Sequence, residues 1–275
     1  MNSKNSILLV DPEFDPNTAE NCNLLIKITS DSFSYAIIDK IHQQIKAVYD
    51  QQECHDVPAE LAERLKHDSY LMLTYKEIKI SVYTENTIAV PNEIFEVENL
   101  DQYARFFTET QGDKLYIQPF ATYGFTSIFS LHKFIDELLN TSLECSKFFD
   151  HESPVLALAG GKKKVLQLDF SASSFNALYV NDGKLIFSNY YQIENSEEFN
   201  YYLLFIVQQL QIDTAHTVLS LSGIIHQGDA HYECVSKYFS HIEFSTALNE
   251  GLDGRILEDM PSHYYSSLLA LDLCG

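Results

Sequence analysis

A three-stranded meander occurs twice in this chain, and this repeat constrains the fold more than any other feature. Residues 164–191 (KVLQLDFSASSFNALYVNDGKLIFSNYY) are three short alternating apolar runs separated by turn residues, the pattern of half-buried strands. Residues 24–49 align with them without a gap at a constant offset of 142 positions, the distance from Phe33 to Phe175. Because the offset is about half of the 275 residues, we interpret the repeat as an internal duplication that begins each of two lobes.

Matched positions support this interpretation. The first strand of each copy alternates in the same phase, and the turn after it ends in Ser-Phe in both copies. The second copy then has Asp182-Gly183, a pair that adopts the positive φ angles of a tight hairpin turn at little steric cost. The first copy has Asp39-Lys40 there, so we expect a different turn.

The charge of the chain restricts its partners. It has 39 acidic and 18 basic residues and a formal net charge of −21. A field of this sign repels phosphate backbones and anionic membranes. Nucleic acid is therefore not an expected partner, and the simplest explanation of the charge is solubility.

The cysteines and the apolar runs indicate a cytoplasmic protein. An odd number of well-separated cysteines without a C-x-x-C pair is typical of reduced thiols; they are Cys22, Cys54, Cys145, Cys234 and Cys274. The apolar run at residues 7–10 is too short for a signal peptide, and the run at 203–207 is too short for a membrane span. We expect no membrane span.

Outside the two meanders, apolar spacing predicts several further elements. Residues 1–22 are predicted to be an extended or disordered lead-in. Two strands are expected within residues 75–90. Further strands are expected at 115–120, 124–130, 217–221 and 242–244, and helices at 58–67, 97–108, 131–139, 196–211, 230–238 and 263–273. Helix 196–211 has an N-cap in Asn195 and a capping-box Glu198; its apolar residues cover more than one face, which predicts burial on several sides.

The element order carries a resemblance. Two copies of a β-β-β-α-β-α-β unit resemble the actin-like ATPase superfamily, which includes actin, sugar kinases and heat-shock chaperones. More closely, the segments ITSDSFSYAIID, YTENTIAVPNEIF, VNDGKLIFSNYY, EFNYYLLFIVQQL and LSLSGII look like an uncharacterised bacterial family of domain-of-unknown-function proteins with that fold, over residues 22–274. The resemblance implies an α/β fold of duplicated ribonuclease-H-like units with mixed sheets, with a first lobe at residues 23–153 and a second at 154–275.

The resemblance also implies where a nucleotide would bind. In the superfamily, ATP lies between the lobes, and the first hairpin of each lobe holds its phosphates with an Asp and small glycines. Backbone N–H groups must approach the phosphates closely, and the acidic group helps to hold the cation. Here Asp169 matches that Asp, but Ser171 and Ser173 lie where the superfamily has glycines. In the first lobe Lys27 aligns with Asp169, and Ser32 lies in another turn without glycine.

A third nucleotide element of the superfamily is a Gly-Gly turn beside adenosine, of which this chain keeps Gly223 alone. Gly223 could equally end a strand with no ligand. The whole chain has 10 glycines, against about 19 at average usage. Two other polar clusters, residues 226–231 (HQGDAH) and Cys54-His55-Asp56, match no established metal or thiol-enzyme motif.

Two functional hypotheses follow. The first is a non-catalytic protein of actin-like fold with a degenerate nucleotide site, which acts as a binding or scaffolding module for a protein partner at the cleft between the lobes or through exposed strand edges. The alternative is an ATP-binding phosphotransferase or ATPase with atypical phosphate loops. In that case Asp169 would organise Mg²⁺, and serine hydroxyls would bind phosphate. The sequence identifies neither the partner nor the oligomeric state.

Overall fold

The computed structural model describes residues 5–108, 113–248 and 251–275. The chain divides into two compact units, Met1–Ser153 and Pro154–Gly275. Residues 1–4 of the expected lead-in lie outside the described part. Each unit has its own sheet and its own buried apolar core.

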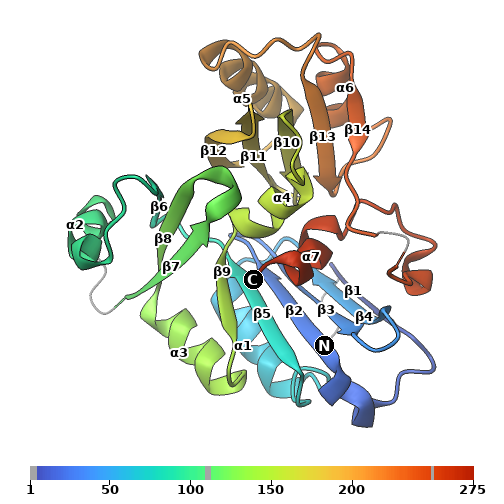
Figure 1. The fold of residues 1–275 in the computed structure, drawn as a ribbon. Helices are drawn as coiled ribbons and strands as arrows, with labels where there is room; N and C mark the ends of the chain where they lie inside the picture. Colours follow the sequence, from blue (N-terminus) through green and yellow to red (C-terminus); the bar gives the residue numbers. More distant parts are fainter. Residues whose placement is uncertain (1–4, 109–112, 249–250) are drawn as a thin grey trace. The chain divides into compact units, whose positions relative to one another are not determined.

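The first unit is built on a six-stranded mixed sheet with the order β1-β4-β3-β2-β5-β9 (Figure 1). Strands β2, β3 and β4 form the antiparallel meander, and β5 and β9 run parallel to β2. The strand bounds are β1 Ser6–Val10, β2 Cys22–Ile28, β3 Phe33–Asp39, β4 Gln44–Gln51, β5 Glu77–Val82 and β9 Lys147–Asp150.

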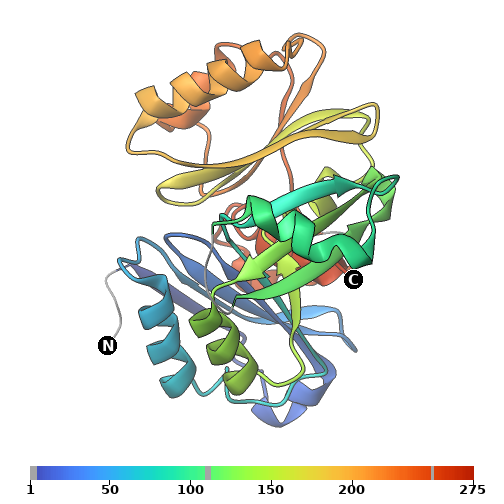
Figure 2. The ribbon, with the colours of Figure 1, turned by 90° about the vertical axis from the view of Figure 1, so that its left-hand side faces the viewer.

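Two helices, α1 (Val57–His67) and α3 (Lys133–Ser142), lie side by side on one face of this sheet (Figure 2). Asp56 begins α1 by accepting the N–H of Ala59, and Leu61 and Leu65, four residues apart, face the core. A separate three-stranded sheet, of order β6-β8-β7, and a short helix complete the unit. Their bounds are β6 Thr87–Pro91, β7 Lys114–Phe120, β8 Phe125–Leu131 and α2 Leu100–Tyr103.

Helix α4 (Glu152–Ala159) begins two residues before the boundary, and the rest of it belongs to the second unit. The five-stranded sheet of this unit has the order β12-β11-β10-β13-β14, again an antiparallel meander followed by parallel strands. Helices α5 and α6 pack against one another on one face (Figure 2). The bounds are β10 Lys164–Phe170, β11 Ser174–Asn181, β12 Lys184–Gln192, α5 Ser196–Gln209, β13 Val218–Gly223, α6 Ala230–Ser236, β14 Ile242–Phe244 and α7 Ser266–Ala270.

The two meanders match at the offset of 142 positions. Strand β2 corresponds residue for residue to β10, and both sheets place the next parallel strand beside it. The register of each meander shifts once, between Ile37 and Ile38 and between Tyr179 and Val180. The two shifts are therefore also 142 positions apart. As expected, Asp182 and Gly183 both take positive φ in the second hairpin.

Several local predictions need correction. The expected lead-in contains β1, which pairs with β4 along its whole length. Helix 97–108 is broken into a 3-10 turn, the four-residue α2 and a second 3-10 turn. Helix α5 is not buried on several sides, because Tyr201, Leu204 and Phe205 are 63, 38 and 46 % exposed.

Candidate functional site

The carboxylate of Asp169, the residue that matches the superfamily Asp, lies in the core of the second unit. It is 4 % exposed near the end of β10. Ser222, opposite it in the parallel strand β13, donates its hydroxyl to Asp169 Oδ1 at 2.7 Å. Gln167 Nε2 in turn donates to the Ser222 hydroxyl at 3.2 Å. Asp169 is thus part of a buried hydrogen-bond chain between two strands.

Gly223 follows Ser222 and has a steric role of its own. Its φ is +80°, and a Cβ at this position would lie 2.0 Å from the carbonyl oxygen of Phe170. The backbone around it is fully engaged: Gly223 N–H donates to His263 O and Ile224 N–H donates to Phe170 O, both at 2.9 Å. Close approach of β13 to β10 therefore accounts for this glycine without a ligand.

Ser171 and Ser173 lie half-buried in the turn between β10 and β11. The N–H of Ser171 donates to Ser174 O at 2.9 Å, and Ser173 O accepts the N–H of Ile193 at 2.9 Å. The turn is therefore closed by its own backbone. The structure brings both serines into the same hairpin as Asp169, while Ser32 belongs to the other unit.

In the first unit, the position equivalent to Asp169 is held by Lys27 on β2. Opposite Lys27 on β5 is Ser81, which corresponds to Ser222. Among the described residues, the buried Ser81 hydroxyl has no hydrogen-bond partner. Burial raises the pKa of Asp50 on β4, and the charge of Lys27 opposes this shift. A cation thus lies where the superfamily places an acid.

The turn that contains Ser32 binds its own polar groups. Thr29 donates its hydroxyl to Asp31 Oδ1 at 2.7 Å and lies 2.6 Å from the hydroxyl of Ser32. The N–H of Thr29 donates to Ser32 O at 2.9 Å, the same backbone bond that closes the other hairpin. All three side chains are buried. Within this turn, the hydroxyls are engaged with one another.

A buried ion pair closes the end of β9. Asp150 is fully buried, and His151 Nδ1 lies 3.0 Å from its carboxylate. Burial alone would raise the pKa of Asp150, but the His151 charge and hydrogen bonds from His151, Glu152 N–H and Ser127 lower it to about 2. Burial would lower the pKa of His151, but the neighbouring carboxylate outweighs it and raises that pKa. Sequence reasoning missed this pair, because β9 is only four residues long.

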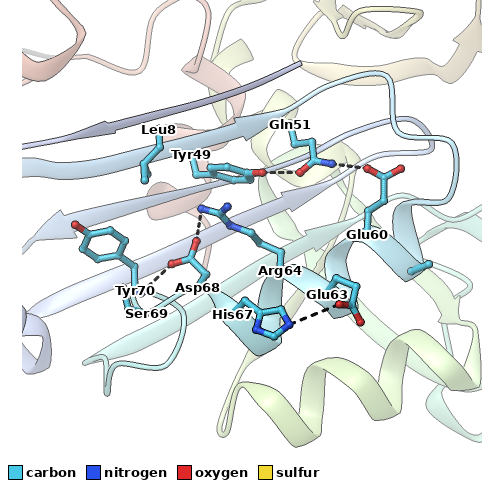
Figure 3. A pocket seen from close by; sticks show the side chains of 11 residues that line it. Leu8, Tyr49, Gln51, Glu60, Glu63, Arg64, His67, Asp68, Ser69 and Tyr70 are labelled. Atoms are coloured by element: carbon cyan, nitrogen blue, oxygen red, sulfur yellow. Dashed lines mark hydrogen bonds and ion pairs between the residues drawn. The ribbon is translucent and has the colours of Figure 1, made fainter. Parts of the chain in front are cut away.

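An open groove of about 690 Å³ lies between helix α1 and the β1–β4 side of the first sheet (Figure 3). Helix α1 provides one wall and the strand residues Leu8, Tyr49 and Gln51 provide the other. The full lining is Leu8, Tyr49, Gln51, Ala59, Glu60, Glu63, Arg64, His67, Asp68, Ser69 and Tyr70.

Arg64 organises the floor of this groove. Its guanidinium carbon lies 3.8 Å from the centre of the Tyr49 ring, a cation–π contact. One guanidinium nitrogen lies 2.5 Å from the carboxylate of Asp68, which also accepts the hydroxyl of Tyr35 at 2.8 Å. The Tyr70 N–H donates to the other Asp68 oxygen at 2.8 Å. The floor is therefore a fixed polar and aromatic surface.

The rim of the groove is acidic. Glu60 accepts the side-chain amide of Gln51, which itself accepts the Tyr49 hydroxyl. Glu63 is 65 % exposed and pairs with Lys66 and His67 on its own helix. Since Arg64 offsets Asp68, these two glutamates leave the lining with a net negative charge. The glutamates, Arg64 and His67 recur at helical spacing, which in sequence looks like an ordinary solvated face.

The other polar clusters have local roles. Asp229 begins α6 by accepting the N–H of Tyr232 at 2.7 Å. Burial raises the pKa of the Cys54 thiol to about 12, which favours the neutral thiol over a nucleophilic thiolate. Across residues 5–108, 113–248 and 251–275, no three His, Cys, Asp or Glu side chains gather as a metal site. Among the helices of the same residues, none has the length and apolar character to cross a membrane.

Comparison with known proteins adds a family and a fold. A family model described as "Protein of unknown function (DUF3822)" matches residues 11–242. No curated protein matches the chain. A Bacteroides thetaiotaomicron protein of actin-like ATPase fold and unknown function is similar at a TM-score of 0.75 with 17% identity, and the match covers 95% of this chain and 99% of that one.

Two further solved structures share the fold at lower similarity. The PilM-PilN type IV pilus biogenesis complex matches at a TM-score of 0.62 with 13% identity over 91% of this chain and 97% of the other. The ethanolamine utilization protein EutJ from Carboxydothermus hydrogenoformans matches at 0.53 with 7% identity over 97% and 93%. At these identities the matches establish the actin-like ATPase fold alone.

Proposed function

The chain belongs to the DUF3822 family of proteins of unknown function, and we propose that it is a non-catalytic module of actin-like ATPase fold that binds a protein partner. The fold itself supports either a nucleotide enzyme or a binding protein. The choice between them depends on the two hairpins and the residues around them.

The observation that carries the proposal is the exchange of charge between the two units. Asp169 and Lys27 occupy equivalent positions on β10 and β2. Mg²⁺ is bound in proteins by oxygen ligands, usually carboxylates, together with substrate phosphates. An ammonium group at the position of Lys27 would oppose a cation bound beside it, so the first unit lacks the acidic group that the superfamily arrangement provides for a magnesium nucleotide.

The state of the neighbouring hydroxyls supports the same conclusion. The hydroxyls of Thr29 and Ser32 contact each other inside the first turn, and the Ser222 hydroxyl is donated to Asp169. A donor already bound to a protein acceptor must exchange that bond before it can bind phosphate. In the first turn, this argues against Ser32 as a substitute for a missing glycine.

A structure of the same fold supports a protein as the partner. The PilM-PilN match is a complex in type IV pilus biogenesis, so a protein similar in fold to this chain occurs in an assembly with another protein. We extend to this chain only the class of partner, a protein.

Titration with ATP and Mg²⁺ tests the proposal. A ligand present at 100 times its dissociation constant stabilises a protein by about 2.7 kcal/mol, which a thermal-shift assay detects. We expect no shift with millimolar ATP or ADP in the presence of Mg²⁺, and none for Asp169→Ala relative to its own baseline. Magnesium-dependent ATP hydrolysis that is lost in Asp169→Ala would refute the proposal.

A further inference from the structure

Strand β1 forms one edge of the first sheet and pairs only with β4 among the described strands. Asn5 O accepts the N–H of Gln52, and Asp11 N–H donates to Lys46 O. The backbone N–H and C=O groups of the odd-numbered residues therefore point toward β4. In an antiparallel pair, the backbone hydrogen-bonding groups of successive residues point alternately toward the partner strand and away from it. The backbone groups of Leu8 and Val10 therefore point to the open edge.

The side chains of this edge strand are unusually apolar. Ile7 and Leu8 are each 44 % exposed, and the strand, SILLV, has none of the charges or prolines that normally protect an edge from pairing. Successive residues point to opposite faces. Leu8 lies on the face of the groove, which it lines, and Ile7 lies on the other face.

The edge and the groove are thus two parts of one surface. A strand added beside β1 would lie about 4.8 Å from it. Every second side chain of that strand would point to the groove face, toward Leu8, Tyr49 and Tyr70. Glu60 and Glu63 on α1 would face those side chains with negative charge.

We propose that an extended segment of a partner protein binds along β1 as an additional strand, with alternate apolar side chains and at least one Lys or Arg directed into the groove between β1 and α1. Main-chain hydrogen bonds to Leu8 and Val10 supply affinity, and the groove supplies specificity. The basic residue follows from charge complementarity with the acidic rim. This inference rests on the proposed function, because it identifies the surface and the chemistry of the protein partner.

A library of random ten-residue peptides displayed on phage, selected against the full chain, is a direct probe. We expect the enriched peptides to alternate apolar residues and to contain Lys or Arg. Synthetic copies should lose at least tenfold in affinity for Leu8→Lys, because a buried leucine contact is replaced by a charge that repels the peptide cation. Binding of these peptides to the unmodified chain should also slow hydrogen exchange at the backbone amides of Leu8 and Val10.

Two matched variants serve as controls. Ile7→Lys changes an equally exposed residue on the opposite face of the same strand and should change affinity less than threefold. Glu63→Gln should weaken the binding of basic peptides. Glu137→Gln should not, although Glu137 on α3 is 64 % exposed and is likewise paired with a lysine.

Three results would overturn the inference. They are the absence of any enriched peptide whose binding depends on Leu8, an equal loss of peptide affinity in Leu8→Lys and Ile7→Lys, and enriched peptides that share acidic rather than basic residues. These results are separable from failure of the proposed function. Peptide binding at β1 together with ATP hydrolysis would refute only the non-catalytic proposal. The absence of both activities would refute only the docking site.

Discussion

Replacement of Gly223 by alanine should strongly destabilise the second unit. A Cβ at this position would lie 2.0 Å from Phe170 O and 2.8 Å from Phe170 N, and both are backbone atoms that cannot rotate away. Positive φ costs a residue with a Cβ about 1–2 kcal/mol. Overpacking adds about 1–3 kcal/mol, and loss of the hydrogen bond from Ile224 to Phe170 adds about 0.5–1.5 kcal/mol. The sum is about 2.5–6.5 kcal/mol.

Gly183→Ala is the matched control. Gly183 has a φ of +75° in the turn between β11 and β12, but a Cβ there would meet nothing within 4 Å. The positive φ alone should therefore destabilise this variant, by about 1–2 kcal/mol.

The assay is urea unfolding followed by far-UV circular dichroism. Because the two units can unfold separately, hydrogen exchange of the β10 and β11 amides identifies the transition of the second unit. Equal destabilisation of the two variants, within about 1 kcal/mol, would show that contact with β10 does not require glycine at position 223.

Three further predictions concern packing and charge. Arg64→Ala should cost about 3–5 kcal/mol because it leaves the buried carboxylate of Asp68 without its cation; urea unfolding of a double-mutant cycle with Asp68→Asn should recover part of that loss, and strict additivity would contradict it. The pKa of His151 is raised in the folded chain, so its stabilising contribution is present below pH 6.5 and should fall as the pH rises through the folded-state pKa. His151→Gln should flatten this part of a profile of unfolding free energy against pH. An unchanged slope would contradict the ion pair. Leu203→Ala should cost about 2–5 kcal/mol, whereas its exposed neighbour Leu204→Ala should stay within about 0.5 kcal/mol, as thermal unfolding can check; equal losses would contradict the orientation of α5.

The meanders were predictable because their signals are local. Alternation fixes which side chains of a strand share a face, and Asp182-Gly183 specifies its own turn. The order of the elements predicts mixed sheets, and its resemblance to the actin-like ATPase superfamily implies the fold, which the solved structures confirm. The same spacing arguments gave α1 to within one residue of its start.

Elements that depend on distant partners were not predictable. Strand β1 pairs with β4 along its whole length, whereas its short apolar run alone does not distinguish a strand from other structures. In α5 the apolar residues on several faces predict burial on several sides, but Tyr201 and Phe205 stack on each other at the surface. The period of a helix shows which residues share a face, whereas the depth of packing over that face depends on the neighbouring elements.

The candidate site divides in the same way. The contrast between Asp169 and Lys27 could be found from sequence, because the repeat aligns the two positions. The partners of Asp169 could not, since Ser222 lies 53 residues away. The groove combines residues of β1, β4 and α1, so only the fold assembles it.

The matching register shifts of the two meanders have a consequence for how this architecture tolerates change. In each meander the third strand carries one extra residue at the shift, Lys46 in β4 and Ile186 in β12, and the inward and outward positions after it depend on that residue. Deletion of that residue would turn every later side chain of the strand to the wrong side of its sheet. A substitution in such a strand destabilises the fold less than a deletion does. The lengths of the strands can therefore be retained while most of their residues change. A chain of this fold can thus keep a TM-score of 0.75 to a protein with which it shares 17% of its residues.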